Sequence, residues 1–168
     1  MTTKKFRAKK IRDTEWAYGY YVVDEEWAKH YIYYDKLVGA FYQLVRNEVE
    51  KETVGQSTGL YDNTKWEDLT PKEQEDWLGL YYNQKDSWKG KEIYEGDILS
   101  SYPEVPNKII KFGDTYGLIQ SEDGYYGWYL KYVKPIDDLE ACHLNSFITD
   151  SNKVIGNIYD NPELLGTI

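Results

Sequence analysis

The chain has 168 residues, of which 41% are hydrophobic and 29% charged, a balance typical of one globular domain or two small subdomains. Cys142 is the single cysteine, which excludes a disulfide framework and a cysteine-based zinc site. No apolar run approaches the length of about 20 residues that spans a bilayer. Residues 1–12 lack the apolar core of a secretory signal, so we expect a protein of the reducing cytoplasm.

The charges are unevenly distributed along the chain. There are 20 Lys and Arg against 29 Asp and Glu, a net charge of −9, although residues 1–12 hold only basic charges. The acidic remainder repels phosphate, so binding to nucleic acid is disfavoured. The basic start either guards a strand edge against aggregation or contacts an anionic partner. Its basic residues are Lys4, Lys5, Arg7, Lys9, Lys10 and Arg12.

The first third of the chain predicts strands at residues 6–11, 16–23, 29–34 and 41–49, which are rich in tyrosine and β-branched residues. Acidic residues 24–26 and the pair Gly39 and Ala40 predict turns between them. A further strand is predicted at residues 53–60, where two glycines indicate a bulge or a close approach of backbone.

Residues 61–90 form a long excursion that contains the one clear helix signal. Thr70 and Glu73 have the spacing of a capping box, and Pro71 stands at the first helical position. We therefore predict a helix over residues 71–78, ended by Gly79.

The last part of the chain returns to short strands, predicted at residues 91–94, 98–102, 107–112, 116–121, 125–132, 142–148 and 154–159. Hairpin turns are predicted at residues 113–115 and 123–124, and a final helical turn is predicted to be capped by Asn161. The fold class is thus mainly β, with many short antiparallel strands, an SH3-like barrel in the C-terminal part and one inserted α-helix near 71–78. We expect a β subdomain at 1–50 and a barrel subdomain at 51–168 that carries the helical insertion 61–90.

The chain offers little that could carry catalysis. Cys142 and His143 are adjacent, so in a strand their side chains point to opposite faces and do not form a nucleophile–base pair. Three acidic residues surround one glycine turn, where a divalent cation is conceivable but an Asp that accepts a turn hydrogen bond is the preferred interpretation. They are Glu92, Glu95 and Asp97. We expect no enzyme activity, no catalytic residue, no cofactor and no metal.

Aromatic residues are unusually frequent, with 18 Tyr, 6 Trp and 4 Phe. Such residues fill cores and cross-strand pairs in β-proteins, and they also supply binding platforms and interface contacts. Several lie in the 61–90 excursion, where they either fold back on the barrel or form a partner surface. These candidate protein-binding residues are Trp66, Trp77, Tyr81, Tyr82 and Trp88.

Three segments together resemble a known family. They are TVGQSTGL at 53–60, KGKEIYEGDI at 89–98 and VIGNIYDNPELL at 154–165, and KFRA at 5–8 is similar to the start of the same family. In order and wording they resemble the YopX-like proteins of phages and prophages of Gram-positive bacteria. The resemblance implies a phage-encoded protein of the host cytoplasm, with no established activity to carry over. Shorter members of the family join the first two motifs by a tight turn, which implies that 61–88 expands a hairpin tip.

These observations lead to a first interpretation and two alternatives. The first is a non-enzymatic phage accessory protein that binds a host or phage protein and self-associates as a homo-oligomer. The second is a module that binds a small ligand, a sugar or nucleotide, on aromatic platforms. The third is a carboxylate-dependent hydrolase, for which the sequence singles out no carboxylate pair.

Overall fold

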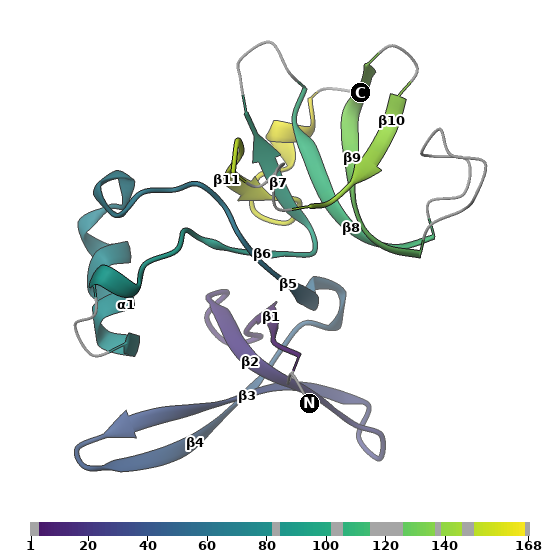
Figure 1. Ribbon diagram of the computed structural model, residues 1–168. Coiled ribbons are helices and arrows are strands. Elements are labelled where there is room, and N and C mark those ends of the chain that lie inside the picture. The colour runs from purple at the N-terminus through teal and green to yellow at the C-terminus, as the bar shows by residue number, and fades with distance from the viewer. Residues whose placement is uncertain are drawn as a thin grey trace. The chain divides into compact units, whose positions relative to one another are not determined.

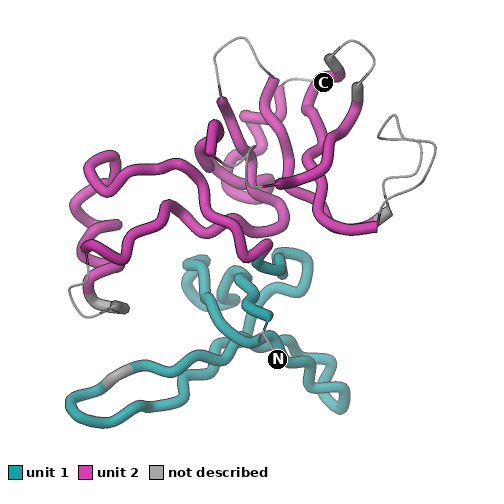
Figure 2. Tube along the Cα trace, in the orientation of Figure 1, with its two compact units in different colours: residues 1–57 teal, residues 58–168 magenta. Residues whose placement is uncertain are grey.

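The computed structural model describes residues 4–81, 85–101, 106–114, 126–136, 139–145 and 150–166. The chain divides into two compact units, residues 1–57 and 58–168 (Figure 2). Antiparallel strands dominate both units and one α-helix lies in the second (Figure 1). The prediction of a mainly β protein with one inserted helix is therefore confirmed.

The first unit contains four complete strands and the start of a fifth. These are β1 (Phe6–Lys9), β2 (Trp16–Asp24), β3 (Lys29–Val38), β4 (Phe41–Glu48) and the first residues of β5 (Gly55–Tyr61), with a 3-10 turn η1 at Lys51–Thr53. Their order in the sheet is β4-β3-β2-β1-β5, which leaves β4 at an edge. β3 extends four residues beyond the predicted strand because residues 34–38 pair with β4 across the turn at Gly39.

The core of the first unit follows the two-residue period of its strands. Ala8 lies opposite Ala17, and both pack with Ile32 and Val49 on one face of the sheet. A bridge between Lys10 and Val49 joins the base of β4 to the chain that follows β1, so the sheet curls back on itself there.

The second unit holds the helix and a five-stranded antiparallel sheet. Its elements are the end of β5, η2 (Trp66–Asp68), α1 (Pro71–Tyr81), η3 (Lys85–Ser87), β6 (Glu92–Tyr94), β7 (Asp97–Ser100), β8 (Lys108–Asp114), β9 (Tyr126–Ile136), β10 (Leu139–His143), β11 (Lys153–Asn157) and η4 (Pro162–Leu165). β5 pairs with β6, and the larger sheet has the order β10-β9-β8-β7-β11.

The core of the second unit lies against this sheet. Ile93, Leu99, Ile110 and Leu130 are fully buried and contact one another, with Leu144 at their margin. Among the described strands, β10 and β11 are the two edges of the sheet and are not paired with each other. The sheet is therefore open, and a closed SH3-like barrel is not formed.

Several local predictions can be compared with the structure. α1 continues through Gly79 to Tyr81, so the predicted end of the helix was wrong. Glycine costs a helix about 1 kcal/mol relative to alanine, but it can adopt the helical conformation. Asn161 precedes η4 without a side-chain capping bond, because its Oδ1 instead accepts from the N–H of Asn157. The predicted strand at 116–121, the turn at 123–124 and the end of the strand at 142–148 lie outside the described residues.

The turn between β6 and β7 has the role expected for its aspartate. Asp97 is buried, and its Oδ2 accepts the N–H of Tyr94 at 2.8 Å across a turn in which Gly96 has a φ of +83°. This contact confirms the interpretation of Asp97 as a turn residue.

Candidate functional site

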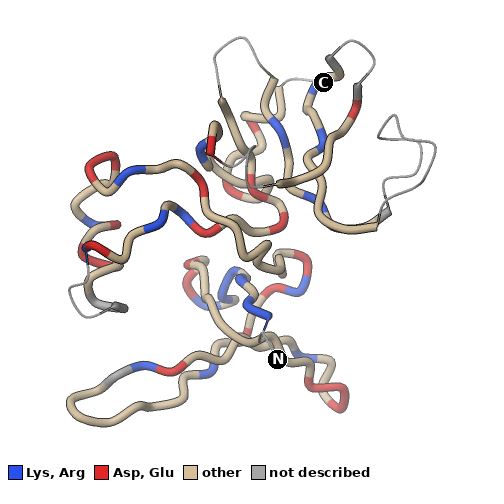
Figure 3. The backbone as a smooth tube through the Cα atoms, in the orientation of Figure 1, with Lys and Arg blue, Asp and Glu red and all other residues tan. Residues whose placement is uncertain are grey.

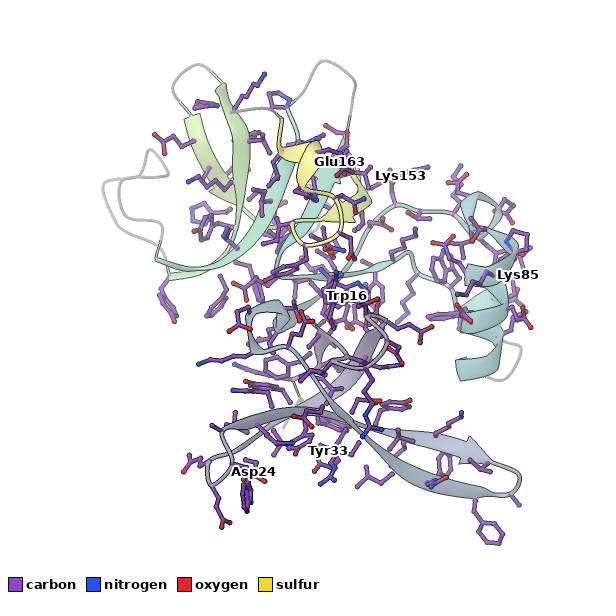
Figure 4. All side chains as sticks on the ribbon, turned by 180° about the vertical axis from the view of Figure 1, so that it is seen from behind. Trp16, Asp24, Tyr33, Lys85, Lys153 and Glu163 are labelled. Carbon is purple, nitrogen blue, oxygen red and sulfur yellow. The ribbon has the colours of Figure 1, made fainter. Side chains whose placement is uncertain are left out.

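Three of the predicted aromatic residues come together in the 61–90 segment. The Trp88 ring is the centre of the group, with its centroid 4.9 Å from that of Trp77 on α1 and 6.0 Å from that of Trp66 on η2, both in edge-to-face geometry. Its indole N–H donates to the Thr64 carbonyl at 2.7 Å. Lys85, labelled in Figure 4, places its Nζ 6.0 Å from the Trp66 ring.

Trp66, Trp77 and Trp88, which we call the tryptophan cluster, form a small core within their own segment and not an open binding platform. All three side chains are half-buried, and each ring packs against another. Of the other two predicted residues, Tyr81 ends α1 and Tyr82 lies outside the described residues. The rings hold together the short helix, which has too few turns to be stable alone.

The predicted capping box is present at the start of α1. The Thr70 N–H and hydroxyl both donate to Glu73 Oε2 at 2.8 Å, and the Glu73 N–H donates back to the Thr70 hydroxyl at 3.3 Å. Glu73 Oε1 also pairs with Lys91 Nζ at 2.8 Å, which ties the helix to the chain beside β6. Burial alone would raise the pKa of Glu73, but the bonds from Lys91 and Thr70 outweigh it and lower the pKa to about 2.

Replacing the capping threonine tests how much these bonds stabilise the helix. We expect Thr70→Ala to lower the free energy of unfolding by about 1 kcal/mol, because two side-chain bonds of the cap are lost. Thr70→Ser keeps the hydroxyl and serves as the control. Amide hydrogen exchange of α1 measures the effect, and equal protection in the two variants would contradict it.

The lowered pKa of Glu73 predicts a loss of stability in acid. Its carboxylate stabilises the folded chain fully above the ordinary value of 4.5, and this contribution disappears as the pH falls toward the folded-state pKa of about 2. Glu73→Gln lacks this titration. The difference in Tm between wild type and Glu73→Gln should therefore shrink as the pH falls through this window, measured by tryptophan fluorescence. A difference independent of pH would argue against the Lys91 and Thr70 contacts as its source.

A buried aspartate closes the base of the 61–90 segment. Asp62 is only 3% exposed, and its carboxylate accepts four hydrogen bonds. Oδ1 accepts the N–H groups of Thr64 at 3.0 Å and Lys91 at 2.8 Å, while Oδ2 accepts the Thr64 hydroxyl at 2.7 Å and the Val154 N–H at 2.8 Å. The Asp62 N–H also donates to the Lys91 carbonyl at 2.9 Å. We call this arrangement the Asp62 clamp, since it joins the ends of β5, β6 and β11.

A second aromatic surface, which the sequence interpretation did not single out as a site, lies on the hairpin of β3 and β4. β2 pairs with β3 only as far as Tyr20 opposite Tyr33, whereas β3 and β4 remain paired out to Val38 opposite Phe41. The hairpin therefore continues beyond the sheet as a two-stranded ribbon (Figure 1). We call residues 35–44 the arm.

The outer part of the arm is apolar and exposed. Val38 is 52% exposed, Phe41 80%, Tyr42 69% and Leu44 61%. Residues 37–45 contain no charged residue, and the loop end of the hairpin is free of charge in Figure 3. Exposed apolar side chains therefore lie on both faces of the ribbon, Val38 and Phe41 on one and Tyr42 and Leu44 on the other, as is typical of an interaction site. The sequence signal was the uncharged run itself, but its exposure depends on where the pairing of β2 with β3 stops, at Tyr20.

The residues with catalytic potential are dispersed. On β10, Cys142 lies opposite Leu130 and His143 opposite Tyr129, so the two side chains face opposite sides of the sheet. Burial raises the pKa of Cys142, which keeps its thiol protonated at neutral pH. Across the described part of the chain, no group of three or more His, Cys, Asp or Glu is placed to hold a metal ion. None of the described helices has the length and apolar character needed to cross a membrane.

Comparison with known proteins identifies the family of the chain. Residues 66–166 match the family model described as YopX protein. No curated protein and no solved structure matches the chain. The match includes α1, the tryptophan cluster and the five-stranded sheet, and two of the three segments singled out in the sequence fall within it. Since the match covers more than half of the chain, the protein belongs to the YopX family.

Proposed function

We propose that this protein is a phage- or prophage-encoded accessory protein of the host cytoplasm that acts without catalysis, by binding another protein through the arm of its N-terminal unit. The observation that carries the proposal is the exposed apolar tip formed by Val38, Phe41, Tyr42 and Leu44. Aromatic and aliphatic side chains that become buried at the centre of an interface supply most of its binding energy. Membership of the YopX family supports the phage origin.

Affinity capture from phage-infected host extract tests this proposal. The wild-type chain should retain a protein in stoichiometric amount, and Phe41→Ser should weaken that retention about tenfold or more, on the order of 1.4 kcal/mol. Phe41 is the most exposed aromatic of the arm, so its replacement leaves the core of the unit intact.

The matched control is Trp27→Ser. Trp27 is 68% exposed in the turn at the opposite end of β3, so this variant also removes one exposed aromatic from the same unit. Retention that survives Phe41→Ser, or that is lost equally with Trp27→Ser, would contradict a role of the arm. The Trp66→Ala and Trp88→Ala double variant tests the tryptophan cluster as the alternative binding surface.

The absence of catalysis is a separate part of the proposal. The opposite facing of Cys142 and His143 and the raised pKa of the thiol support it. His143→Gln should leave partner capture unchanged. Any turnover that this substitution abolishes in a folded chain would refute the non-enzymatic function.

A second candidate function is the binding of a sugar or nucleotide on the outer face of the N-terminal sheet. Tyr20 lies opposite Tyr33, which in turn lies opposite Arg46, and the guanidinium of Arg46 stacks 4.9 Å from the Tyr31 ring centroid. Tyr33 is labelled in Figure 4. Tyr31 is buried, whereas Tyr20 is 45% exposed and can accept a flat or sugar-like ligand by stacking. Native mass spectrometry of the purified chain should then show a bound small molecule that Tyr20→Ala removes.

A further inference from the structure

We infer that the protein bound by the arm is a second copy of the same chain, whose β4 pairs antiparallel with β4 about a twofold axis at Gln43. This inference rests on the proposed function, because it names the partner of the same surface. The two arms would form a four-stranded sheet of order β3-β4-β4-β3. Three properties of the arm support this pairing: the direction of its backbone groups, the pattern of its side chains and the low stability of a two-stranded ribbon.

The backbone of β4 alternates in direction from one residue to the next. The Val49 N–H donates to the His30 carbonyl at 2.9 Å, so odd-numbered residues direct their backbone toward β3. The even-numbered residues direct theirs to the outer edge, where the Ile11 N–H donates to the Glu48 carbonyl at 3.1 Å. That contact covers the base of the edge only. Nearer the turn, the backbone N–H and C=O of Leu44 point away from β3. They lie on the outer side of β4, which is the last strand in the order of the sheet.

The side chains of β4 match those of a second β4 when the two strands run antiparallel. Antiparallel pairing about Gln43 places Tyr42 opposite Leu44 of the second copy and Phe41 opposite Val45 of the second copy, so every cross-strand pair is apolar apart from the two glutamines. Residues 37–45 hold no charge, and pairing over 41–45 therefore brings no like charges together. Natural edge strands usually carry charges or proline that prevent such pairing, and both are missing from this stretch.

The arm also lacks support from its own sheet. Residues 34–38 of β3 pair with β4 and lie beyond the last β2–β3 pair. A two-stranded hairpin is at best marginally stable in water, and further strands are what make such a ribbon stable. A second arm supplies those strands and brings Tyr42 of each copy into cross-strand contact with Leu44 of the other.

Disulfide trapping and light scattering test this pairing. The background is the full chain with Cys142→Ser, which has no native cysteine. Gln43→Cys places the two cysteines directly opposite each other within disulfide reach and should give a covalent dimer on mild oxidation. Lys36→Cys is the matched control, since Lys36 lies opposite Gln43 on β3. Two such cysteines would be three strand spacings apart, about 14 Å, and should not cross-link.

Light scattering on the uncross-linked chain provides the second readout. The wild type should be dimeric, and Leu44→Lys should raise the dimer dissociation constant by at least about tenfold because it places two charges near each other at the edge. Far-ultraviolet circular dichroism confirms that the variant is folded. A monomeric wild type, or equal cross-linking of Gln43→Cys and Lys36→Cys, overturns the inference.

The two proposals fail in different ways. If the chain is monomeric and Phe41→Ser still abolishes capture of another protein, the pairing is wrong while the proposed function stands. If the dimer and its cross-link appear but nothing else is captured, the pairing stands, and the arm has no partner other than a second copy.

Discussion

Asp62→Ala is expected to destabilise the second unit more than the replacement of any exposed residue of that unit. The change removes the acceptor of three backbone N–H groups and one hydroxyl, all belonging to the Asp62 clamp. Hydrogen bonds to a buried charge contribute more than neutral ones, and orphaned donors add a desolvation cost. We expect a loss of about 3 kcal/mol or more in the free energy of unfolding, or a decrease in Tm of roughly 10 °C.

Asp68→Ala is the control for this prediction. Asp68 lies in the same segment and pairs with Lys153 of β11 at 2.7 Å, but both side chains are more than 40% exposed. An exposed pair contributes about 0–1 kcal/mol, so this variant should unfold close to wild type. Chemical denaturation followed by tryptophan fluorescence compares the two. Similar midpoints for Asp62→Ala and Asp68→Ala would show that the clamp is not a main support of the unit.

Gly90→Ala is expected to lower the free energy of unfolding by a similar amount to Asp62→Ala, because of a steric clash. Gly90 has a φ of +110°, and a Cβ atom there would lie 1.9 Å from the backbone oxygen of Asp62. The obstacle is backbone and not the end of a flexible side chain, so relief requires the chain at the Asp62 clamp to move. We expect a destabilisation of about 3 kcal/mol, the sum of the dihedral cost and the displaced backbone.

Gly59→Ala separates these two contributions. Gly59 in β5 also has a positive φ, +75°, but a Cβ there would meet nothing within 4 Å. This variant should therefore show only the cost of the left-handed conformation, about 1–2 kcal/mol. The difference between the two variants in urea denaturation measures the clash. Equal effects would mean that the backbone near Asp62 adjusts freely.

The features predicted well from sequence are those that depend on nearby residues. The capping box at Thr70 and Glu73 and the turn aspartate Asp97 were correctly predicted, because each is defined within four residues of chain. The start of α1 followed from Pro71 for the same reason. The end of α1 could not be predicted in this way, because a glycine allows a helix to end but does not force it to.

The features that were missed depend on contacts between distant residues. The role of Asp62 is set by Lys91 and Val154, which no local pattern connects to it. Lys108 is only 5% exposed, and burial lowers its pKa, yet in the sequence it reads as a solvent-facing strand residue. Its Nζ donates to the side-chain oxygen of Asn152 at 2.9 Å, a partner 44 residues farther along the chain.

The candidate site shows the same division. The sequence predicted that the aromatic residues of the 61–90 segment either fold back on the barrel or form a partner surface. The packing of Trp66, Trp77 and Trp88 on one another depends on contacts that no local pattern shows. The exposed arm was missed because the sequence of residues 41–49 predicts only a strand and does not show that it extends beyond its sheet. The exposure of Phe41 and Leu44 follows from the early end of the β2–β3 pairing.

The Asp62 clamp also has a consequence for protein engineering. Because Asp62 and Lys91 bond to each other through their backbones at 2.9 Å, residues 63–90 leave and rejoin the sheet at a single point. Thr64 and Gly90 belong to this junction and stay in place, but the part between them, residues 65–89, can be exchanged for another polypeptide with closely spaced termini, as in successful domain insertions. This position therefore offers a place to graft a fluorescent reporter or affinity domain while β6 and the five-stranded sheet keep their pairing.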